Sequence, residues 1–179
     1  ARAVIETERL ILRRWRDEDL EPYVAMRADP QVSAWLDGPF SREEALARIA
    51  RNEAALEAHG YGRMAMERRA DGRFIGYCGL APTGGELPFD GAFEVGWSVI
   101  AGAWGQGYAG EAARAVFADG FKRLDLDRIL AFTGALNLWS QAVAQKLGMT
   151  RRPELDFDHP GLAANHPLKR HIVFLAEKP

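Results

Sequence analysis

The chain has 179 residues, of which 47% are hydrophobic and 27% charged, with 23 basic and 25 acidic side chains. This composition is too apolar for intrinsic disorder, and a formal net charge of −2 gives no electrostatic case for binding nucleic acid or an anionic membrane. No apolar run approaches the roughly 18 residues of a membrane span, and the N-terminus does not resemble a signal sequence. With a single cysteine, these features predict one cytoplasmic domain over residues 1–179.

The first third of the chain predicts one strand and two helices. Residues 9–14 alternate apolar and polar side chains, as a half-buried strand does. Asp17 or Asp19 can cap a helix that ends at Asp29-Pro30. Ser41 and Glu44 form a capping box for a second helix, which stops at Gly60. Its predicted apolar face consists of Leu46, Ile49, Ala50 and Leu56.

The rest of the chain intermixes strands and helices without strict alternation. This order predicts one α/β or α+β layer domain with a mixed sheet. The predicted elements are strands over 62–69 and 73–80 joined by a turn at 70–72, a loop over 82–91, a strand over 92–100, a helix over 111–124, a buried strand over 128–133, a helix over 139–147, an irregular stretch to about 168 and a strand over 171–176.

Glycine is concentrated in one part of the chain, with nine of the 18 glycines between Gly84 and Gly120. Residues 105–110 match G-x-G-x-x-G between a strand and a helix, where free N–H groups can bind a pyrophosphate. A dinucleotide site is one interpretation, with Asp125 as its acidic residue. However, Asp125 precedes the next strand instead of ending it, and too little chain follows to complete that fold. A tight turn without a ligand is the other interpretation.

The neighbourhood of this cluster resembles the acetyl-CoA pyrophosphate loop of the GNAT N-acetyltransferase superfamily, in its RimJ/RimL-type branch. Further segments of the chain match the same branch in order and spacing. The matching segments are 104–112 (WGQGYAGEA), 7–13 (TERLILR), 29–32 (DPQV), Gly76 and Gly79, 94–97 (EVGW), Asn137, Ser140 and 146–149 (KLGM). The resemblance departs from the wider superfamily at Trp104, where Arg or Gln is usual, and at Gly110, where a hydroxyl residue is common.

This resemblance implies a mixed, mostly antiparallel central sheet with helices on both faces. It also implies direct transfer of an acetyl group from acetyl-CoA to a primary amine. The residues implied to bind acetyl-CoA are Trp104, Gly105, Gln106, Gly107, Tyr108, Ala109 and Gly110 in the loop, Asn137, and the backbone of Ser98, Val99 and Ile100 where two strands part.

Acetyl transfer to an amine requires a proton acceptor, since an α-ammonium group with a pKa of about 7.7–8.0 is largely charged at pH 7. Glu94 matches the acidic position of the branch, and a carboxylate on a mostly buried strand can have a raised pKa. The alternative is that Glu94 faces solvent between Phe93 and Val95. By its match to the family, Ser140 would hydrogen-bond the leaving sulfur. The alternative for both Ser140 and Asn137 is that they only begin a helix.

Several other residues invite a functional interpretation. The carboxylates and histidines of the tail fit no compact ligand set, so we expect no metal, and the tail instead resembles a loop that walls the substrate pocket in some members of the branch. We expect Cys78 to be a core residue. Trp35 and Phe40 are either core or acceptor pocket. The pairs Arg68-Arg69 and Arg151-Arg152 are either solvated or bound to the 3′-phosphate of CoA. The tail residues in question are Asp156, Asp158, His159, His166 and His171.

Three functional hypotheses follow. The first is an acetyl-CoA-dependent N-acetyltransferase. The second is a CoA-binding module without catalysis, and the third is a nicotinamide enzyme based on the glycine motif alone. The acceptor stays open between a protein N-terminus, an aminoglycoside, a polyamine and a small metabolite amine. A homodimer is compatible with the sequence, but no sequence feature requires one.

Overall fold

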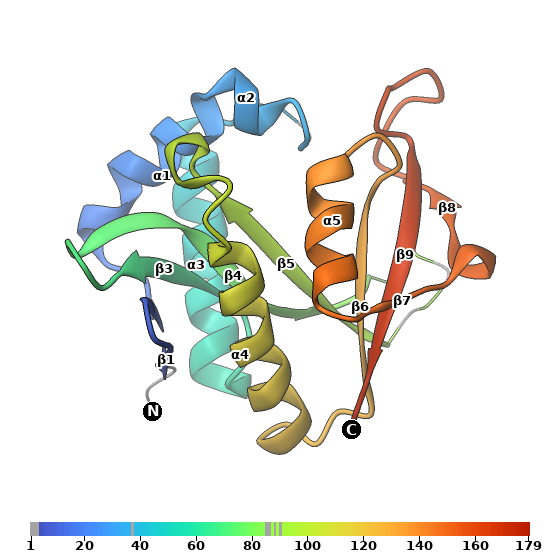
Figure 1. Cartoon of the computed structure of the whole chain (residues 1–179). Coiled ribbons are helices and arrows are strands. Elements are labelled where there is room, and N and C mark those ends of the chain that lie inside the picture. The colour runs from blue at the N-terminus through green and yellow to red at the C-terminus, as the bar shows by residue number, and fades with distance from the viewer. Residues whose placement is uncertain (1–3, 37, 85–86, 88, 90) are drawn as a thin grey trace.

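The computed structural model describes residues 4–36, 38–84, 87, 89 and 91–179. These residues form one sheet in the order β1-β2-β3-β4-β5-β6-β9-β7, with β8 paired to β9 (Figure 1). Neighbouring strands are antiparallel except β5 and β6, which are parallel. The strands are β1 (Ile5–Glu6), β2 (Leu10–Arg13), β3 (Arg63–Arg68), β4 (Arg73–Pro82), β5 (Phe93–Val99), β6 (Arg128–Gly134), β7 (Thr150–Arg151), β8 (Phe157–Asp158) and β9 (Arg170–Glu177).

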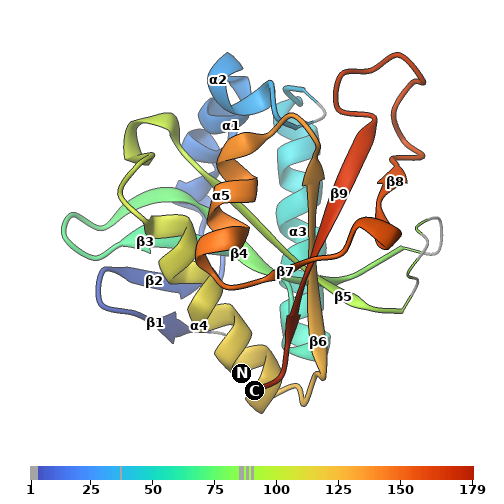
Figure 2. The same cartoon turned by 45° about the vertical axis from the view of Figure 1, so that its right-hand side comes forward.

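Helices cover both faces of this sheet, which confirms the mixed α+β fold expected from the resemblance. Helix α3 lies on one face, and α4 and α5 lie on the other (Figures 1 and 2). In the described part of the chain, no helix is both long enough and apolar enough to cross a membrane. The helices are α1 (Leu20–Ala28), α2 (Pro30–Ser33), α3 (Arg42–His59), α4 (Tyr108–Lys122) and α5 (Leu138–Lys146), with short 3-10 turns η1 (Asp17–Asp19), η2 (Ala101–Ala103) and η3 (Pro153–Leu155).

The hydrophobic core is divided by the sheet. On one side α4 packs its small and aromatic residues, such as Ala112, Ala113 and Phe117, against β2 to β5. On the other side an aromatic cluster around Trp15 and Tyr23 joins the N-terminal helices to the sheet. The far face of β6 and β9 carries no helix among the described residues, and side chains of the 83–92 loop and of the tail cover it instead. These side chains are Leu87, Phe89, Ala92, Leu155 and Phe157.

Helix α3 begins and ends where the sequence predicts. Ser41 Oγ accepts a hydrogen bond of 3.1 Å from the Glu44 amide, and Gly60 ends the helix with φ +75°. The predicted apolar face is wrong in part, because Leu46 is 50% exposed and Ala50 is also exposed. The contact face is narrower and includes Ala45 and Leu56. A helix this polar contacts the sheet along a single stripe.

Other differences concern short elements. Helix α4 begins at Tyr108, three residues earlier than predicted, because Gly107 adopts φ +81° and turns the chain directly into the helix. The elements β1, α2, β7 and β8 were not predicted, since two to four residues carry too little periodicity to be recognised. Within the predicted 82–91 loop, residues 85, 86, 88 and 90 lie outside the described residues.

The sheet leaves no room for a side chain at Gly79. A Cβ at this position would lie 1.9 Å from the Gly62 carbonyl oxygen and 2.7 Å from Arg63 Cα. We expect Gly79→Ala to lower the free energy of unfolding by about 2 kcal/mol or more, because backbone must move to relieve the overlap. Urea denaturation followed by circular dichroism measures the change. Gly102→Ala is the matched control, since its Cβ would have no atom within 4 Å. Equal midpoints for the two variants would contradict the prediction.

Candidate active site

The parallel strands β5 and β6 meet at one end and separate toward the other. Their only register pair in the described chain is Glu94 with Leu130, near the start of both strands. Beyond it the two strands diverge (Figure 1), and a cavity of about 450 Å³ lies between them. Its walls include Val95, Gly96, Trp97, Ser98 and Val99 from β5, Ala131, Phe132, Thr133 and Gly134 from β6, and Asn137, Trp139, Ser140 and Ala144 from the start of the next helix.

A loop of exposed backbone leads from this cleft into α4. Gly105 and Gly107 have φ of +77° and +81°, in the left-handed region that disfavours other residues. Gly107 is the N-cap, and no side chain in the described part of the chain caps the helix, so the first amides of α4 are left for other acceptors. Together with the helix dipole, these amides form a site suited to an anion. Gln106 lies exposed between the two glycines.

The other loop residues have separate roles. Tyr108 and Ala109 are buried and join the core, so their contribution to a ligand is limited to backbone. Gly110 has space beside it, since a Cβ there would meet only Arg114 Nη1 at 3.9 Å. The dinucleotide interpretation does not fit, because the sheet is mostly antiparallel and Asp125 forms an ion pair with Lys178 at the surface.

The N-terminal strands fasten the first turn of α4 in place. Glu111 accepts hydrogen bonds from Thr7 Oγ1 at 2.6 Å and from the Arg9 amide at 2.8 Å. The Arg9 guanidinium pairs with the same carboxylate at 2.7 Å and stacks over Tyr108 at 4.4 Å. Burial raises the pKa of Glu111, but the hydrogen bonds from Thr7 and Arg9 outweigh it and hold the pKa below its usual value. The family resemblance includes Thr7, Arg9 and Glu111, but it does not indicate that their side chains are in contact.

Glu94 lies in the cavity wall and does not face solvent between Phe93 and Val95. Its side chain is 19% exposed, and Arg63 Nη2 donates to Oε1 at 2.9 Å. Burial raises the pKa of this carboxyl above its ordinary value, although the charge and hydrogen bond of Arg63 oppose the rise. A partly desolvated carboxylate at a cavity wall has the properties of a proton acceptor.

Asn137 and Ser140 are linked at the start of α5. Asn137 Oδ1 accepts from the Ser140 amide at 3.1 Å, so the capping role holds for Asn137. Asn137 Nδ2 donates to Ser140 Oγ at 3.2 Å, and both side chains are buried. Because Ser140 Oγ is the acceptor in this bond, its own hydrogen remains to be donated into the cavity that it lines.

The backbone of Ser98, Val99 and Ile100 is expected to face the cleft, but in the structure only the Val99 amide does so. The Ile100 amide donates to the Ile75 carbonyl in β4 at 2.9 Å, so it points away from the cleft. Successive residues of a strand direct their backbone N–H groups to opposite neighbours. The Ser98 amide, two residues before Ile100, therefore also points toward β4, and the Val99 amide between them points toward the cleft. Trp104 Nε1 donates to the Val99 carbonyl at 2.8 Å and holds the indole at the cavity wall.

The structure assigns Trp35 and Phe40 to different environments. Phe40 packs edge-on against Tyr23 at 5.4 Å, and the Arg27 guanidinium stacks on it at 4.1 Å, so it belongs to the core. Trp35 is 40% exposed and lines the cavity.

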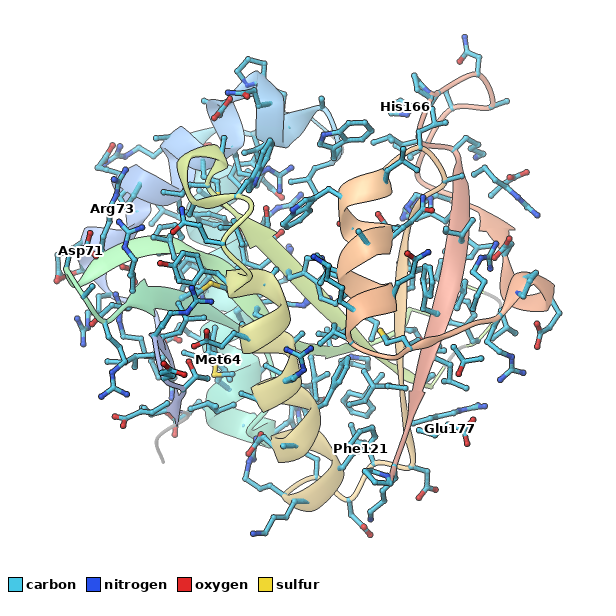
Figure 3. All side chains as sticks on the ribbon, in the orientation of Figure 1. Met64, Asp71, Arg73, Phe121, His166 and Glu177 are labelled. Atoms are coloured by element: carbon cyan, nitrogen blue, oxygen red, sulfur yellow. The ribbon has the colours of Figure 1, made fainter. Side chains whose placement is uncertain are left out.

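The C-terminal tail forms the opposite wall of the cavity. His159, Leu162, Leu168 and His171 line it, and the loop that carries His166 rises above the cleft (Figure 3). Burial, and after it the nearby His159, lower the pKa of His171 below its ordinary value, which favours the neutral imidazole. The Nδ1 atom of His171 is buried and has no hydrogen-bond partner among the described residues. This placement agrees with the expected pocket wall.

Three further predictions concern groups outside the cleft. Arg68 pairs with Asp71, and Arg151 pairs with Asp156, so both arginines already hold a carboxylate. Asp71 lies at the β3–β4 hairpin turn (Figure 3). Cys78 is fully buried, which confirms it as core, and burial raises the pKa of its thiol to about 12. Over the ranges that the structure describes, no group of three or more His, Cys, Asp or Glu side chains could hold a metal.

Comparison with known proteins gives one consistent result. The acetyltransferase (GNAT) domain model matches residues 9–150. FsC-acetyl coenzyme A-N(2)-transacetylase of Aspergillus fumigatus is 31% identical over 157 residues, which cover 84% of this chain and 66% of that protein. The crystal structure of an acetyltransferase from Agrobacterium tumefaciens is 27% identical with a TM-score of 0.78, covering 97% and 94% of the two chains.

A more distant similarity concerns the fold alone. RimL, a ribosomal L7/L12 alpha-N-protein acetyltransferase solved in complex with coenzyme A, has a TM-score of 0.77 at 18% identity, with 97% of each chain covered.

The link between Asn137 and Ser140 can be tested by two substitutions. We expect Asn137→Ala to lower the free energy of unfolding by about 1 kcal/mol, because the N-cap acceptor of α5 is lost. Asn137→Asp keeps that acceptor and loses only the Nδ2 donor, so its stability should stay near wild type. Urea denaturation compares the two variants. If Asn137→Asp loses as much stability as Asn137→Ala, the cap is not what Asn137 contributes.

Proposed function

The chain belongs to the GNAT acetyltransferase family, and from this premise we propose that it transfers an acetyl group from acetyl-CoA to a primary amine. Membership makes it an acyltransferase. The observation that carries the proposal is the cleft between β5 and β6, which has Glu94 and Ser140 in its lining and the uncapped N-terminus of α4 beside it. A donor, an acceptor and a proton-transfer group can therefore meet in one cavity.

The residues of the cleft fit acetyl-CoA. In the proposal the amides from Gly105 to Gly110 hold the pyrophosphate, because two left-handed glycines and an uncapped helix present them together. The Val99 amide, the Trp104 ring and Asn137 line the path of the pantetheine arm. When bound, acetyl-CoA supplies a thioester carbonyl that an amine can attack.

Glu94 is the proposed proton acceptor, either directly or through a water molecule. The pKa of Glu94 is raised, so it lies closer to the pKa of an ammonium group than the pKa of an exposed glutamate does. A smaller difference between the two pKa values favours proton transfer. A carboxylate base works only when ionised. The rate of the reaction should therefore fall as pH decreases through the pKa of Glu94.

Ser140 is the proposed hydrogen-bond donor to the departing sulfur. The support is the orientation imposed by Asn137, which donates to Ser140 Oγ and leaves the hydroxyl hydrogen for another partner. In this arrangement Asn137 positions Ser140 as well as capping α5.

We further propose that residues 1–179 form a single acetyltransferase domain whose acceptor enters between Trp35 and the tail. The family match ends at residue 150, yet β9 lies between β6 and β7, so the tail completes the same sheet. RimL is named for a ribosomal protein α-amine, whereas the Aspergillus relative is named for FsC. Protein N-termini and small-molecule amines are therefore both candidate acceptors, and a panel must contain both.

Ligand binding tests the proposal first. We expect acetyl-CoA to raise the melting temperature by mass action and NADH to leave it unchanged. Gly107→Ala should reduce the acetyl-CoA shift, since a left-handed alanine costs about 1–2 kcal/mol. Gly102→Ala, outside the 105–110 loop, is the matched control and should keep the shift, because its Cβ would have no atom within 4 Å. Stabilisation by NADH in place of acetyl-CoA would overturn the proposal, whereas binding without thiol release from any amine would indicate a CoA-binding module.

The role of Glu94 is tested by turnover. We expect Glu94→Gln to lower the rate of amine-dependent thiol release by about 10²–10⁴-fold, the usual contribution of a general base. The acetyl-CoA dissociation constant, measured by calorimetry, should change little. Glu57→Gln, an exposed carboxylate in α3, serves as control. Wild-type turnover in Glu94→Gln would exclude Glu94 as the base.

A further inference from the structure

One arginine crosses the sheet to reach Glu94. Arg63 is the first residue of β3, and its cross-strand neighbour in β4 is Gly79, whose own neighbour in β5 is Gly96. Glu94 is two residues from Gly96 on β5, so its side chain leaves the same face of the sheet. Arg63 therefore has to cross β4 and then lie over β5, and the position in its way on each of these strands is glycine.

The contacts follow this path. Arg63 Nε donates to the Gly79 carbonyl at 3.0 Å, and Nη2 then reaches Glu94 Oε1 at 2.9 Å. A Cβ on Gly96 would lie 2.7 Å from Arg63 Cζ, so any larger residue there would displace the guanidinium. The position of Arg63 beside Glu94 thus depends on the absence of a side chain at Gly96.

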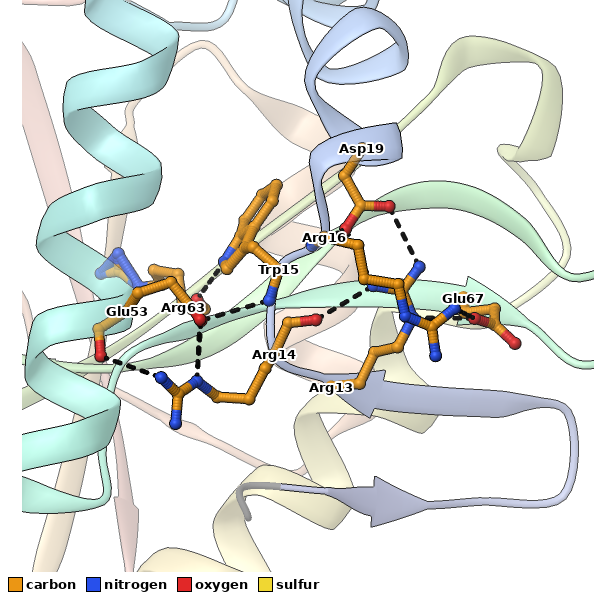
Figure 4. A network of polar contacts seen from close by, with 8 residues as sticks. All are labelled: Arg13, Arg14, Trp15, Arg16, Asp19, Glu53, Arg63 and Glu67. Atoms are coloured by element: carbon orange, nitrogen blue, oxygen red, sulfur yellow. Dashed lines mark hydrogen bonds and ion pairs between the residues drawn. The ribbon is translucent and has the colours of Figure 1, made fainter. Parts of the chain in front are cut away.

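The backbone of Arg63 is also fixed, as Figure 4 shows in part. Trp15 Nε1 donates to the Arg63 carbonyl at 2.9 Å, and Glu53 in α3 accepts from the Trp15 amide at 3.2 Å. On its other side, Asn52 Oδ1 accepts from the Arg63 amide at 3.0 Å. An arginine held at both backbone groups and at two of its guanidinium nitrogens has little freedom to leave the carboxylate.

We propose that Arg63 is a positioning residue that orients the Glu94 carboxylate through Oε1 and keeps it charged for proton transfer. This inference rests on the proposed function, in which Glu94 is the base. The ion pair uses Oε1, so Oε2 is left to accept a proton from the amine or from water. Arg63 itself transfers no proton, because a guanidinium stays protonated.

Other charged and titratable groups border the same cavity. Arg27 from α1 and Arg48 from α3 lie toward the Trp35 side, and Tyr77 lies on β4. His159 and His171 belong to the tail wall. Because other titratable side chains line the same cavity, activity alone cannot assign a pH effect to Glu94, and the test must observe that carboxyl directly.

The experiment measures the titration of Glu94 in the full chain without substrates. Carbon-13 NMR of labelled glutamate follows each carboxyl with pH, and the signal missing in Glu94→Gln identifies Glu94. We expect Arg63→Met to raise the titration midpoint of Glu94 by about one pH unit or more, because an opposite charge lowers a carboxyl pKa by 1–3 units. The acid limb of kcat/KM should move to higher pH by the same amount. Arg63→Lys should restore much of the shift.

Gly96→Ala tests the same inference without removing the charge of Arg63 or of Glu94. The three atoms nearest to its Cβ all belong to the Arg63 guanidinium and none to the backbone, so we expect the fold to persist while the guanidinium is displaced and the Glu94 midpoint rises. Arg68→Met, which breaks the ion pair with Asp71 at the other end of β3, is the control and should leave the midpoint unchanged.

The outcomes separate this inference from the proposed function. If the Glu94 midpoint is the same in wild type, Arg63→Met and Gly96→Ala, the positioning role is overturned, whatever the activity. If Glu94→Gln keeps wild-type turnover, the base assignment fails on its own, even where the NMR shift is present. If the wild type releases no thiol with any amine, the proposed function fails, and the NMR shift alone still reports the ion pair.

Discussion

The separation of β5 from β6 is the constraint on which the rest of the structure depends. A parallel pair that stays together would bond its inner backbone edges and leave no cavity. Here the pair holds one register contact, at Glu94, and then opens. A buried N–H or C=O without a partner costs about 1–3 kcal/mol, so the open edges require a ligand or water to replace the missing strand. In the proposed function an extended ligand arm carrying amide groups would satisfy that need, and α4 begins beside the same opening.

The glycines of this chain meet two different physical requirements. Gly105 and Gly107 are needed for a backbone conformation, since both have φ in the left-handed region. Gly79 and Gly96 are needed for space, because neighbouring backbone or the Arg63 guanidinium occupies the place of a Cβ. Composition alone records only that glycine is frequent. The register of three strands is needed to show that the second pair lies beside the proposed base.

The sequence predicts the larger elements well and the contacts across the sheet poorly. Capping residues and hydrophobic periodicity are local, so the boundaries of α3 and the β3–β4 hairpin are close to the prediction. The glycine loop and the linked pair Asn137 and Ser140 could be proposed from their motifs. The Arg63 contact with Glu94 could not, because 31 residues separate them and only the strand register brings them together. The direction of the Ile100 amide likewise depends on which residues of β5 hydrogen-bond to β4, and no residue type determines that.

The place of β9 in the sheet has a consequence for synthesis of the protein. This strand pairs with β6 along its whole length and also holds β7 and β8, yet it is made after every other element. A nascent chain that has already formed the β1 to β5 half must therefore keep one edge of β6 unpaired until residues 170–177 leave the ribosome. The tail that walls the cavity precedes β9 and is held by it. The cavity between β5 and the tail therefore has both walls in place only after β9 has paired with β6.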